Sequence, residues 1–103
     1  MSKYGAKRTE VDGIWFDSKA EARRYATLAT LERAGKIADL RLQPPFKCIV
    51  NGKSICTYRA DFSYVEGGHV VVEDVKGVQT AAFKLKRKLV EALHEVTIKL
   101  IPA

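Results

Sequence analysis

The chain of 103 residues is poor in cysteine and histidine, with two of each, and it has no long apolar run. Two cysteines are too few for a disulfide framework, and the histidines and cysteines lack the spacing of a zinc site. No run approaches the roughly 18 apolar residues that span a bilayer. The charged first residues lack the apolar segment of a signal peptide. We therefore expect a cytoplasmic protein with reduced cysteines and no membrane partner.

The charge of the chain is unbalanced, because 18 lysines and arginines face 12 acids, which gives a net charge of +6. A small basic domain favours polyanions as partners, and nucleic acid first among them. A merely soluble basic protein would have the same composition, so charge alone does not decide. The length predicts a single domain over residues 1–103, of which residues 1–12 form a mobile basic arm that carries Lys3, Lys7 and Arg8.

Two helices are predicted from their caps and from the spacing of apolar residues. Ser18 followed by Glu21 is a capping-box pattern, and Gly35 is a natural stop for the helix that it begins. Thr80 caps a second helix over residues 81–95. Its predicted apolar face is made of Ala82, Leu85, Leu89, Ala92 and Leu93.

The remaining apolar stretches predict strands. Residues 37–42 are an extended entry that ends at Pro44-Pro45, and residues 46–50, 53–65 and 69–76 form a meander. Asn51-Gly52 marks the first turn. A three-residue loop there would set Cys48 opposite Cys56, whereas a two-residue loop would not. Residues 96–101 form a last strand, which a right-handed crossover can place parallel to the third.

The predicted order is helix, three strands, helix, strand. It indicates an α/β or α+β fold with a central mixed sheet flanked by helices.

Residues 70–77, "VVVEDVKG", place charges at the end of an apolar strand. Since side chains alternate along a strand, Asp74 and Lys76 share one face, and Glu73 and Val75 share the other. Counting back from the turn at 67–68 places Asp61 of the preceding strand near Asp74. Two carboxylates and a lysine are thus expected to meet on one surface of the sheet.

Buried carboxylates a few ångströms apart repel each other unless a cation lies between them. Mg²⁺ or Mn²⁺ is bound by one or two carboxylates together with waters and phosphate oxygens. A nearby lysine can orient a water molecule or stabilise a pentacovalent phosphate, which is the chemistry of metal-assisted phosphodiester hydrolysis. An ordinary ion pair between Asp74 and Lys76, with Asp61 as a surface residue, is the alternative.

The order of elements and the pattern Asp61 … Asp74-Val75-Lys76 resemble the PD-(D/E)XK nuclease superfamily. Two segments, "SKAEARRYATLATLERAGKIADLRLQPPF" and "YRADFSYVEGGHVVVEDVKG", resemble more closely its small phage-encoded endonucleases, which are grouped near endonuclease-I-type and Holliday-junction-resolving enzymes. Ala60 stands where the motif has its proline. The resemblance implies a restriction-endonuclease-like αβββαβ core and an Mg²⁺-dependent DNA endonuclease, with Mn²⁺ as a substitute, acting in a phage-infected cell.

The same resemblance implies the roles of individual residues. Asp61 and Asp74 become metal ligands, the Val75 carbonyl completes the shell, and Lys76 becomes the catalytic lysine. Glu21 becomes an additional catalytic and metal-binding carboxylate, although its place in the capping box offers a competing role. Glu73 faces away and is interpreted as a salt-bridging or substrate-side group.

Further residues are candidates for contacts with DNA. Gln79 lies at the mouth of the expected site, and Lys84, Lys86, Arg87 and Lys88 form a basic helix that can follow a phosphate backbone. A solvated helix face is the alternative. Gln43 is expected at an edge of the site.

Junction, flap, nicked and plain duplex DNA present the same phosphodiester, so the sequence leaves the substrate open. A homodimer is compatible with structure-selective cutting, and a non-catalytic nucleic-acid-binding module on the same fold is the alternative function.

Overall fold

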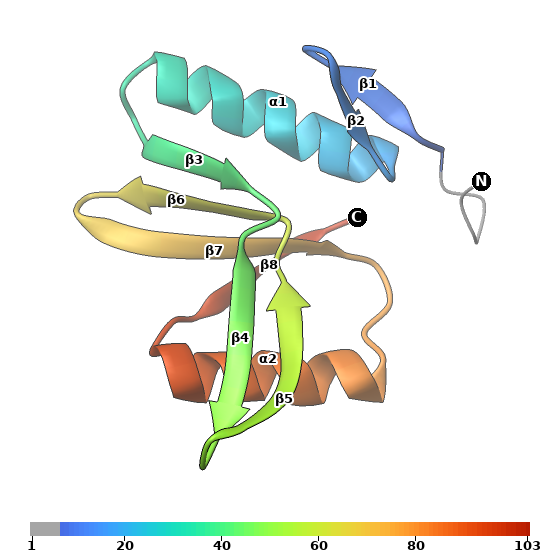
Figure 1. The fold of residues 1–103 in the computed structure, drawn as a ribbon. Coiled ribbons are helices and arrows are strands. Elements are labelled where there is room, and N and C mark those ends of the chain that lie inside the picture. The colour runs from blue at the N-terminus through green and yellow to red at the C-terminus, as the bar shows by residue number, and fades with distance from the viewer. Residues whose placement is uncertain (1–6) are drawn as a thin grey trace.

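Four strands form a central sheet with a helix on each face in the computed structural model, which describes residues 7–103 (Figure 1). The strands are β3 (Ala38–Leu42), β6 (Phe62–Glu66), β7 (His69–Lys76) and β8 (Ile98–Pro102), in the order β3-β6-β7-β8. Strand β6 pairs antiparallel with β3 and β7, whereas β8 lies parallel to β7. The predicted α+β class, with a central mixed sheet flanked by helices, is confirmed.

Both helices begin at their predicted caps. Helix α1 (Lys19–Arg33) starts after Ser18, whose hydroxyl accepts the Glu21 N–H at 3.1 Å, and Gly35 follows its end with φ +75°. Helix α2 (Ala81–His94) starts after Thr80, whose hydroxyl accepts the Phe83 N–H at 3.1 Å. No helix in the described part of the chain is long and apolar enough to cross a membrane.

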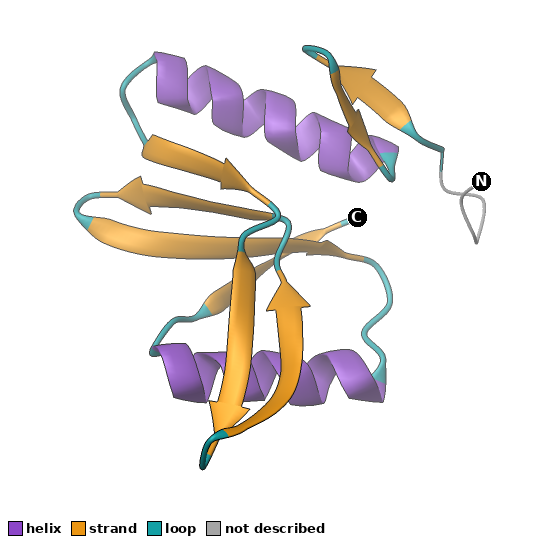
Figure 2. Cartoon of the chain, viewed as in Figure 1, coloured by secondary structure: helices purple, strands orange, loops and turns teal. Residues whose placement is uncertain are grey.

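The predicted meander of residues 46–50, 53–65 and 69–76 is wrong for residues 46–59, which do not belong to the central sheet. Strand β3 is the first strand of the central sheet, and β4 (Pro45–Val50) and β5 (Lys53–Arg59) form a separate two-stranded sheet that crosses α2, as Figure 2 shows. The link from β3 to β4 and the link from β5 to β6 leave the central sheet at the same corner. The Gln43 N–H donates to the Asp61 carbonyl at 2.9 Å, and the Ala60 N–H donates to the Pro44 carbonyl at 3.2 Å. The prolines and the left-handed backbone at Gln43, φ 49°, end β3 at this corner.

The turn of the β4–β5 hairpin has two residues, Asn51 and Gly52, both with positive φ as a tight hairpin turn requires. The register nevertheless pairs Cys48 with Cys56, because a bulge follows and leaves Ile55 as an extra residue. The expectation that a two-residue loop would keep the cysteines apart is therefore wrong. Both thiols are free, as expected.

The chain before α1 is more ordered than predicted. Residues 1–6 of the expected basic arm, with Lys3, lie outside the described residues. Strands β1 (Thr9–Val11) and β2 (Ile14–Phe16) form an antiparallel hairpin around Asp12-Gly13, so the prediction of a mobile arm is wrong for residues 9–11. The hairpin lies beside the N-terminal end of α1 (Figure 1).

Two apolar clusters hold the layers together, one on each face of the sheet. The α1 side contains Phe16, Ala22, Leu28, Ile37, Phe62 and Tyr64, and the α2 side contains Cys48, Tyr58, Ala60, Val72, Phe83, Val90 and Ile98. The predicted apolar face of α2 is right at Leu89, which packs against this cluster, but wrong at Leu85, which is 69% exposed while Phe83 and Val90 are buried. Turning the helix this way buries a phenyl ring instead of the methyl group of Ala82, which removes more apolar area from water.

Candidate functional site

Asp61 and Asp74 meet where β6 leaves the central sheet. The register Phe62↔Glu73 continues to place Asp61 opposite Asp74, as counted from the sequence. The Asp61 N–H donates to Oδ1 of Asp74 at 2.9 Å, and the Val75 N–H donates to Oδ2 of Asp61 at 2.7 Å. Each carboxylate is thus fixed by a backbone donor of the neighbouring strand. A surface position for Asp61, the alternative considered from the sequence, does not fit these bonds.

The burial of these acids disfavours their charged forms. Asp74 is only 2% exposed, and its second oxygen, Oδ2, is buried without a hydrogen-bond partner. Burial raises the pKa of Asp74 to about 6, against the hydrogen bond from the Asp61 N–H and the charges of Lys76 and Arg87. Burial also raises the pKa of Asp61, although the Val75 N–H and the Lys76 charge act in the opposite direction. An orphaned carboxylate oxygen of this kind is a place for a cation or a proton.

Glu21 reaches the same place from the first turn of α1. Burial and the charges of Asp61, Asp17 and Asp74 raise the pKa of Glu21 to about 7, while Lys76 lowers it. The Glu21 carboxyl in turn lowers the pKa of Asp61. The backbone N–H of Glu21, and not its carboxyl, serves the Ser18 cap. The carboxyl is therefore free to face Asp61, and the structure brings together three predicted acids.

Lys76 ends strand β7 beside these acids. Its charge lowers the pKa of Glu21, Asp61 and Asp74, yet no ion pair within 4.0 Å joins it to an acid in the described part of the chain. Its Nζ instead lies 4.7 Å from the ring centroid of Phe83, in a cation–π contact. An ordinary ion pair between Asp74 and Lys76 does not describe this arrangement. The ammonium group is held close to the acids without being neutralised by one of them.

The donor atoms suit a hard divalent ion, although they do not form a closed cage. Within residues 7–103, no group of three or more Asp, Glu, His or Cys side chains is arranged to hold a metal ion. One oxygen of Asp61 and one of Asp74 already accept backbone N–H groups. The remaining oxygens, with the orphaned Oδ2 of Asp74 among them, are the ligand type that Mg²⁺ takes in ones and twos beside waters and phosphate oxygens. The residues thus fit an ion that brings further ligands with it.

Glu73 faces the opposite side of β7, as alternation predicts, and its partners are inside the domain. Arg24 of α1 donates two hydrogen bonds to it, Nε to Oε1 at 2.7 Å and Nη2 to Oε2 at 2.6 Å, and the Tyr64 hydroxyl donates to Oε2. Burial would raise the pKa of Glu73, but the bonds from Arg24 and Tyr64 outweigh it and hold that pKa below its ordinary value. Glu73 thus ties β7 to α1.

The residues predicted to contact DNA are not equivalent. Gln79, Lys84, Lys86 and Lys88 are exposed. Arg87 is used inside the domain, where Nη2 donates to the Ile98 carbonyl at 2.7 Å and Nε lies 3.5 Å from Glu91. The exposed lysines are available to a polyanion, whereas Arg87 joins α2 to β8. The structure separates these residues into two roles that the sequence grouped together.

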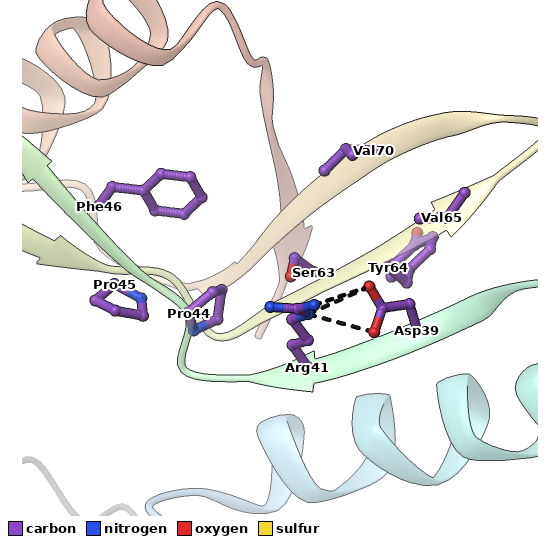
Figure 3. Close-up of a pocket in the computed structure, with 9 residues that line it drawn as sticks. All are labelled: Asp39, Arg41, Pro44, Pro45, Phe46, Ser63, Tyr64, Val65 and Val70. Carbon is purple, nitrogen blue, oxygen red and sulfur yellow. Dashed lines mark hydrogen bonds and ion pairs between the residues drawn. The ribbon is translucent and has the colours of Figure 1, made fainter.

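Two of the candidate acids, Glu21 and Asp61, line a cavity of about 250 Å³ together with Trp15, Leu42 and Gln43, whereas Asp74 is not among its lining residues. A larger cavity of about 530 Å³ lies between β3, β6 and the start of β4 (Figure 3). Its two charged side chains, Asp39 and Arg41, form an ion pair at 3.2 Å. None of the predicted catalytic residues lines it, so the smaller cavity is the candidate site.

Comparison with known protein families places the chain in one of them. A family profile described as a protein of unknown function (DUF1064) matches residues 1–101. The chain belongs to the DUF1064 family. The match spans both helices and all the strands that carry the acids, the lysine and the cavity. A comparison with curated proteins gave no match.

Four side chains of this DUF1064 domain were not singled out from the sequence. Phe83 supports Lys76, and Asp17 adds a negative charge that raises the pKa of Glu21. Arg24 neutralises Glu73, and Trp15 lines the cavity. Only Trp15 had a local signal, because Asp12-Gly13 between alternating apolar residues is typical of a hairpin. Arg24 depends on a contact between elements far apart in the chain, whereas Asp17 and Phe83 act on residues close to them in the sequence.

Proposed function

We propose that the chain is a metal-dependent DNA endonuclease that hydrolyses phosphodiester bonds, with Mg²⁺ as its ion and Mn²⁺ as a substitute. The observation that carries the proposal is the pair of half-buried Asp61 and buried Asp74, cross-linked through backbone N–H groups and left with an unpartnered oxygen on Asp74. Glu21 and Lys76 complete the group from two other directions. Clustered buried acids cost stability, and a binding protein has no need of them.

The side chains have separable roles in this chemistry. Asp61, Asp74 and the Val75 carbonyl would hold the ion, which when bound neutralises charge on the phosphate and activates water. The Glu21 carboxyl, with a pKa of about 7, can accept the proton that the attacking water loses. The Lys76 ammonium stabilises negative charge that develops on the phosphoryl oxygens, and the Phe83 ring fixes its direction.

Two further observations support this proposal and the choice of substrate. The order α1, β3, β6, β7, α2, β8 is the helix, three strands, helix, strand order that the resemblance to PD-(D/E)XK nucleases implies. The net charge of +6 and the exposed Lys84, Lys86 and Lys88 suit a phosphate backbone. DNA is therefore the proposed substrate, acted on in the host cell of a phage.

The test is nicking of supercoiled plasmid by purified variants in Mg²⁺ and in Mn²⁺. Asp74→Asn and Lys76→Ala should each lower the rate by about 100-fold or more, because each removes a charge that acts at the reacting phosphate. Asp39→Asn and Lys36→Ala are matched controls, since both residues are exposed and lie away from the acids. The controls should cut like the parent chain.

Two results would count against the nuclease. Equal cutting by the parent, Asp74→Asn and Lys76→Ala would remove these residues from the mechanism. DNA binding that persists in EDTA, with no nicking in either metal, would favour the non-catalytic nucleic-acid-binding module. Sedimentation of the active protein with and without DNA would show whether the cutting species is the homodimer that paired cuts require.

A further inference from the structure

The cavity beside the acids has walls that a phosphodiester alone does not require. Glu21 and Asp61 line one part of it, and Ile14, Trp15, Phe16, Leu42 and Gln43 line the rest. A metal-bound phosphate needs oxygen ligands and positive charge. This cavity offers, beside the acids, aromatic and aliphatic surface and one amide. Such a lining is typical of a site for a flat, partly apolar ring with hydrogen-bonding edges.

Trp15 is placed in solvent by the alternation of strand β2. Its neighbours Ile14 and Phe16 pack against the α1 cluster, and Trp15 on the other face is 57% exposed. The guanidinium of Arg8 lies 5.4 Å from its ring centroid. Packing does not explain so much exposed indole beside a cavity that Glu21 and Asp61 also line. An aromatic face with a cation next to it is the usual platform for a stacked base and its phosphate.

Gln43, another residue of the cavity lining, has a backbone conformation that glutamine rarely adopts. Its φ is 49°, it precedes a proline, and its N–H is bonded to the Asp61 carbonyl. A non-glycine residue held in this region is strained, and such residues cluster at functional sites. The conformation fixes Gln43 at the cavity beside Asp61. A glutamine amide can donate to and accept from the edge of a base.

We propose that this cavity binds an unpaired nucleobase of DNA next to the phosphodiester that the acids act on. Trp15 stacks on the base, Gln43 bonds to its edge, and Arg8 lies near the adjoining phosphate. The inference rests on the proposed function for the position of the phosphodiester. It narrows the substrate to DNA with an unpaired nucleotide, such as a single strand, a flap or a branched end, in preference to continuous duplex. A stacked base in a duplex cannot enter the cavity without leaving its helix.

Trp15 is the single tryptophan of the chain, so its fluorescence reports stacking directly. The probe is a short oligothymidylate added to the full chain in EDTA, with a blunt-ended duplex of equal length as the comparison. Saturable quenching should appear with the single strand and be much weaker with the duplex. Anisotropy of the labelled oligonucleotide should show about 5- to 150-fold weaker binding for Trp15→Ala, the range expected for one base–aromatic stack.

Three further variants test whether binding depends on the aromatic ring of Trp15 and on the Gln43 amide. Trp15→Phe retains an aromatic face and should bind more tightly than Trp15→Ala. Ile55→Ala is the matched control, because Ile55 is also 57% exposed but lies on β5, outside the cavity. Gln43→Gly relieves the left-handed backbone, so it should fold at least as stably as the parent. It should lose any preference between oligothymidylate and oligoadenylate.

The outcomes separate this inference from the nuclease itself. Equal quenching by duplex and single strand, or unchanged binding by Trp15→Ala, overturns the base site even if the protein cuts DNA. Trp15-dependent binding of single strands without any cutting in Mg²⁺ or Mn²⁺ supports the base site and overturns the nuclease. Cutting that favours flaps over duplex, with the preference lost in Trp15→Ala but kept in Ile55→Ala, supports both.

Discussion

The contact between Arg24 and Glu73 gives the sharpest test of how this fold is held together. Glu73 is fully buried, and Arg24 neutralises it through two short hydrogen bonds across the α1–β7 interface. Arg24→Ala would leave the carboxylate with the Tyr64 hydroxyl as its only hydrogen-bonding partner in the described part of the chain. We expect the variant to fold and to be markedly less stable.

The magnitude follows from the geometry. Each hydrogen bond to a charged group contributes about 1.5–3 kcal/mol, and breaking a buried pair by removing one partner costs about 3–5 kcal/mol. The Arg24 side chain is 22% exposed, so water can partly replace it and the lower end of that range applies. We expect a loss of about 3 kcal/mol at neutral pH. A domain of this size has a stability of roughly 5–15 kcal/mol.

The stability lost in Arg24→Ala should depend on pH, and the pKa of Glu73 determines the direction of that dependence. The hydrogen bonds from Arg24 and Tyr64 hold the pKa of Glu73 below its ordinary 4.5 in the folded state, despite its burial. Stability from this interaction is therefore present above pH 4.5 and is lost as the pH falls through the folded value. The difference between parent and Arg24→Ala should be full near pH 7 and should shrink in acid.

Urea unfolding followed by circular dichroism measures the free energies. Arg23→Ala is the matched control, because Arg23 is the exposed neighbour on the same helix and should change stability by less than about 0.5 kcal/mol. An Arg24→Ala variant as stable as Arg23→Ala would refute the reasoning. So would a loss that stays the same below pH 4.

Two predictions concern the acids and the lysine. In the metal-free protein, the raised pKa of Asp74, from 3.8 to about 6, means that stability present below pH 3.8 is lost as the pH rises through 6. Asp74→Asn should reduce this loss of stability with rising pH. Above pH 7 it should raise the melting temperature by roughly 4–8 °C, for a gain of about 1 kcal/mol. Mg²⁺ should reduce the difference in melting temperature between variant and parent, because it stabilises only the parent. Phe83→Leu keeps most of the core volume but removes the ring under Lys76, so plasmid nicking should fall by up to about tenfold while stability drops by less than about 1.5 kcal/mol. Phe46→Leu, on the same side of the sheet, is its control and should leave nicking unchanged.

The sequence predicted the parts of the site that depend on local rules. Helices begin after Ser18 and Thr80 because a hydroxyl can satisfy a nearby backbone N–H, whatever the rest of the fold does. Alternation along β7 separates Asp74 from Glu73 because neighbouring side chains of any strand point to opposite faces. A two-glycine turn then fixes the register that brings Asp61 opposite Asp74.

Other features could not be read from the sequence, because they depend on which surfaces meet. The residues 46–59 look like two strands of one sheet, yet the corner at Gln43 and Ala60 carries them onto α2. The sequence also allows two apolar faces for α2, and only contact with the sheet selects Phe83 over Leu85. That selection is what places an aromatic ring under Lys76.

By itself, then, the sequence determined the helices, strand β7, the class of the fold and the meeting of two carboxylates near a lysine. The tertiary structure decided which charges form ion pairs inside the domain and which carboxylate oxygen has no partner. Arg24 and Arg87 are held inside the domain by Glu73 and Glu91, whereas one oxygen of Asp74 remains without a partner. The physical reason is that caps and alternation act between neighbours in the chain, whereas burial and ion pairing act between residues that only folding brings together.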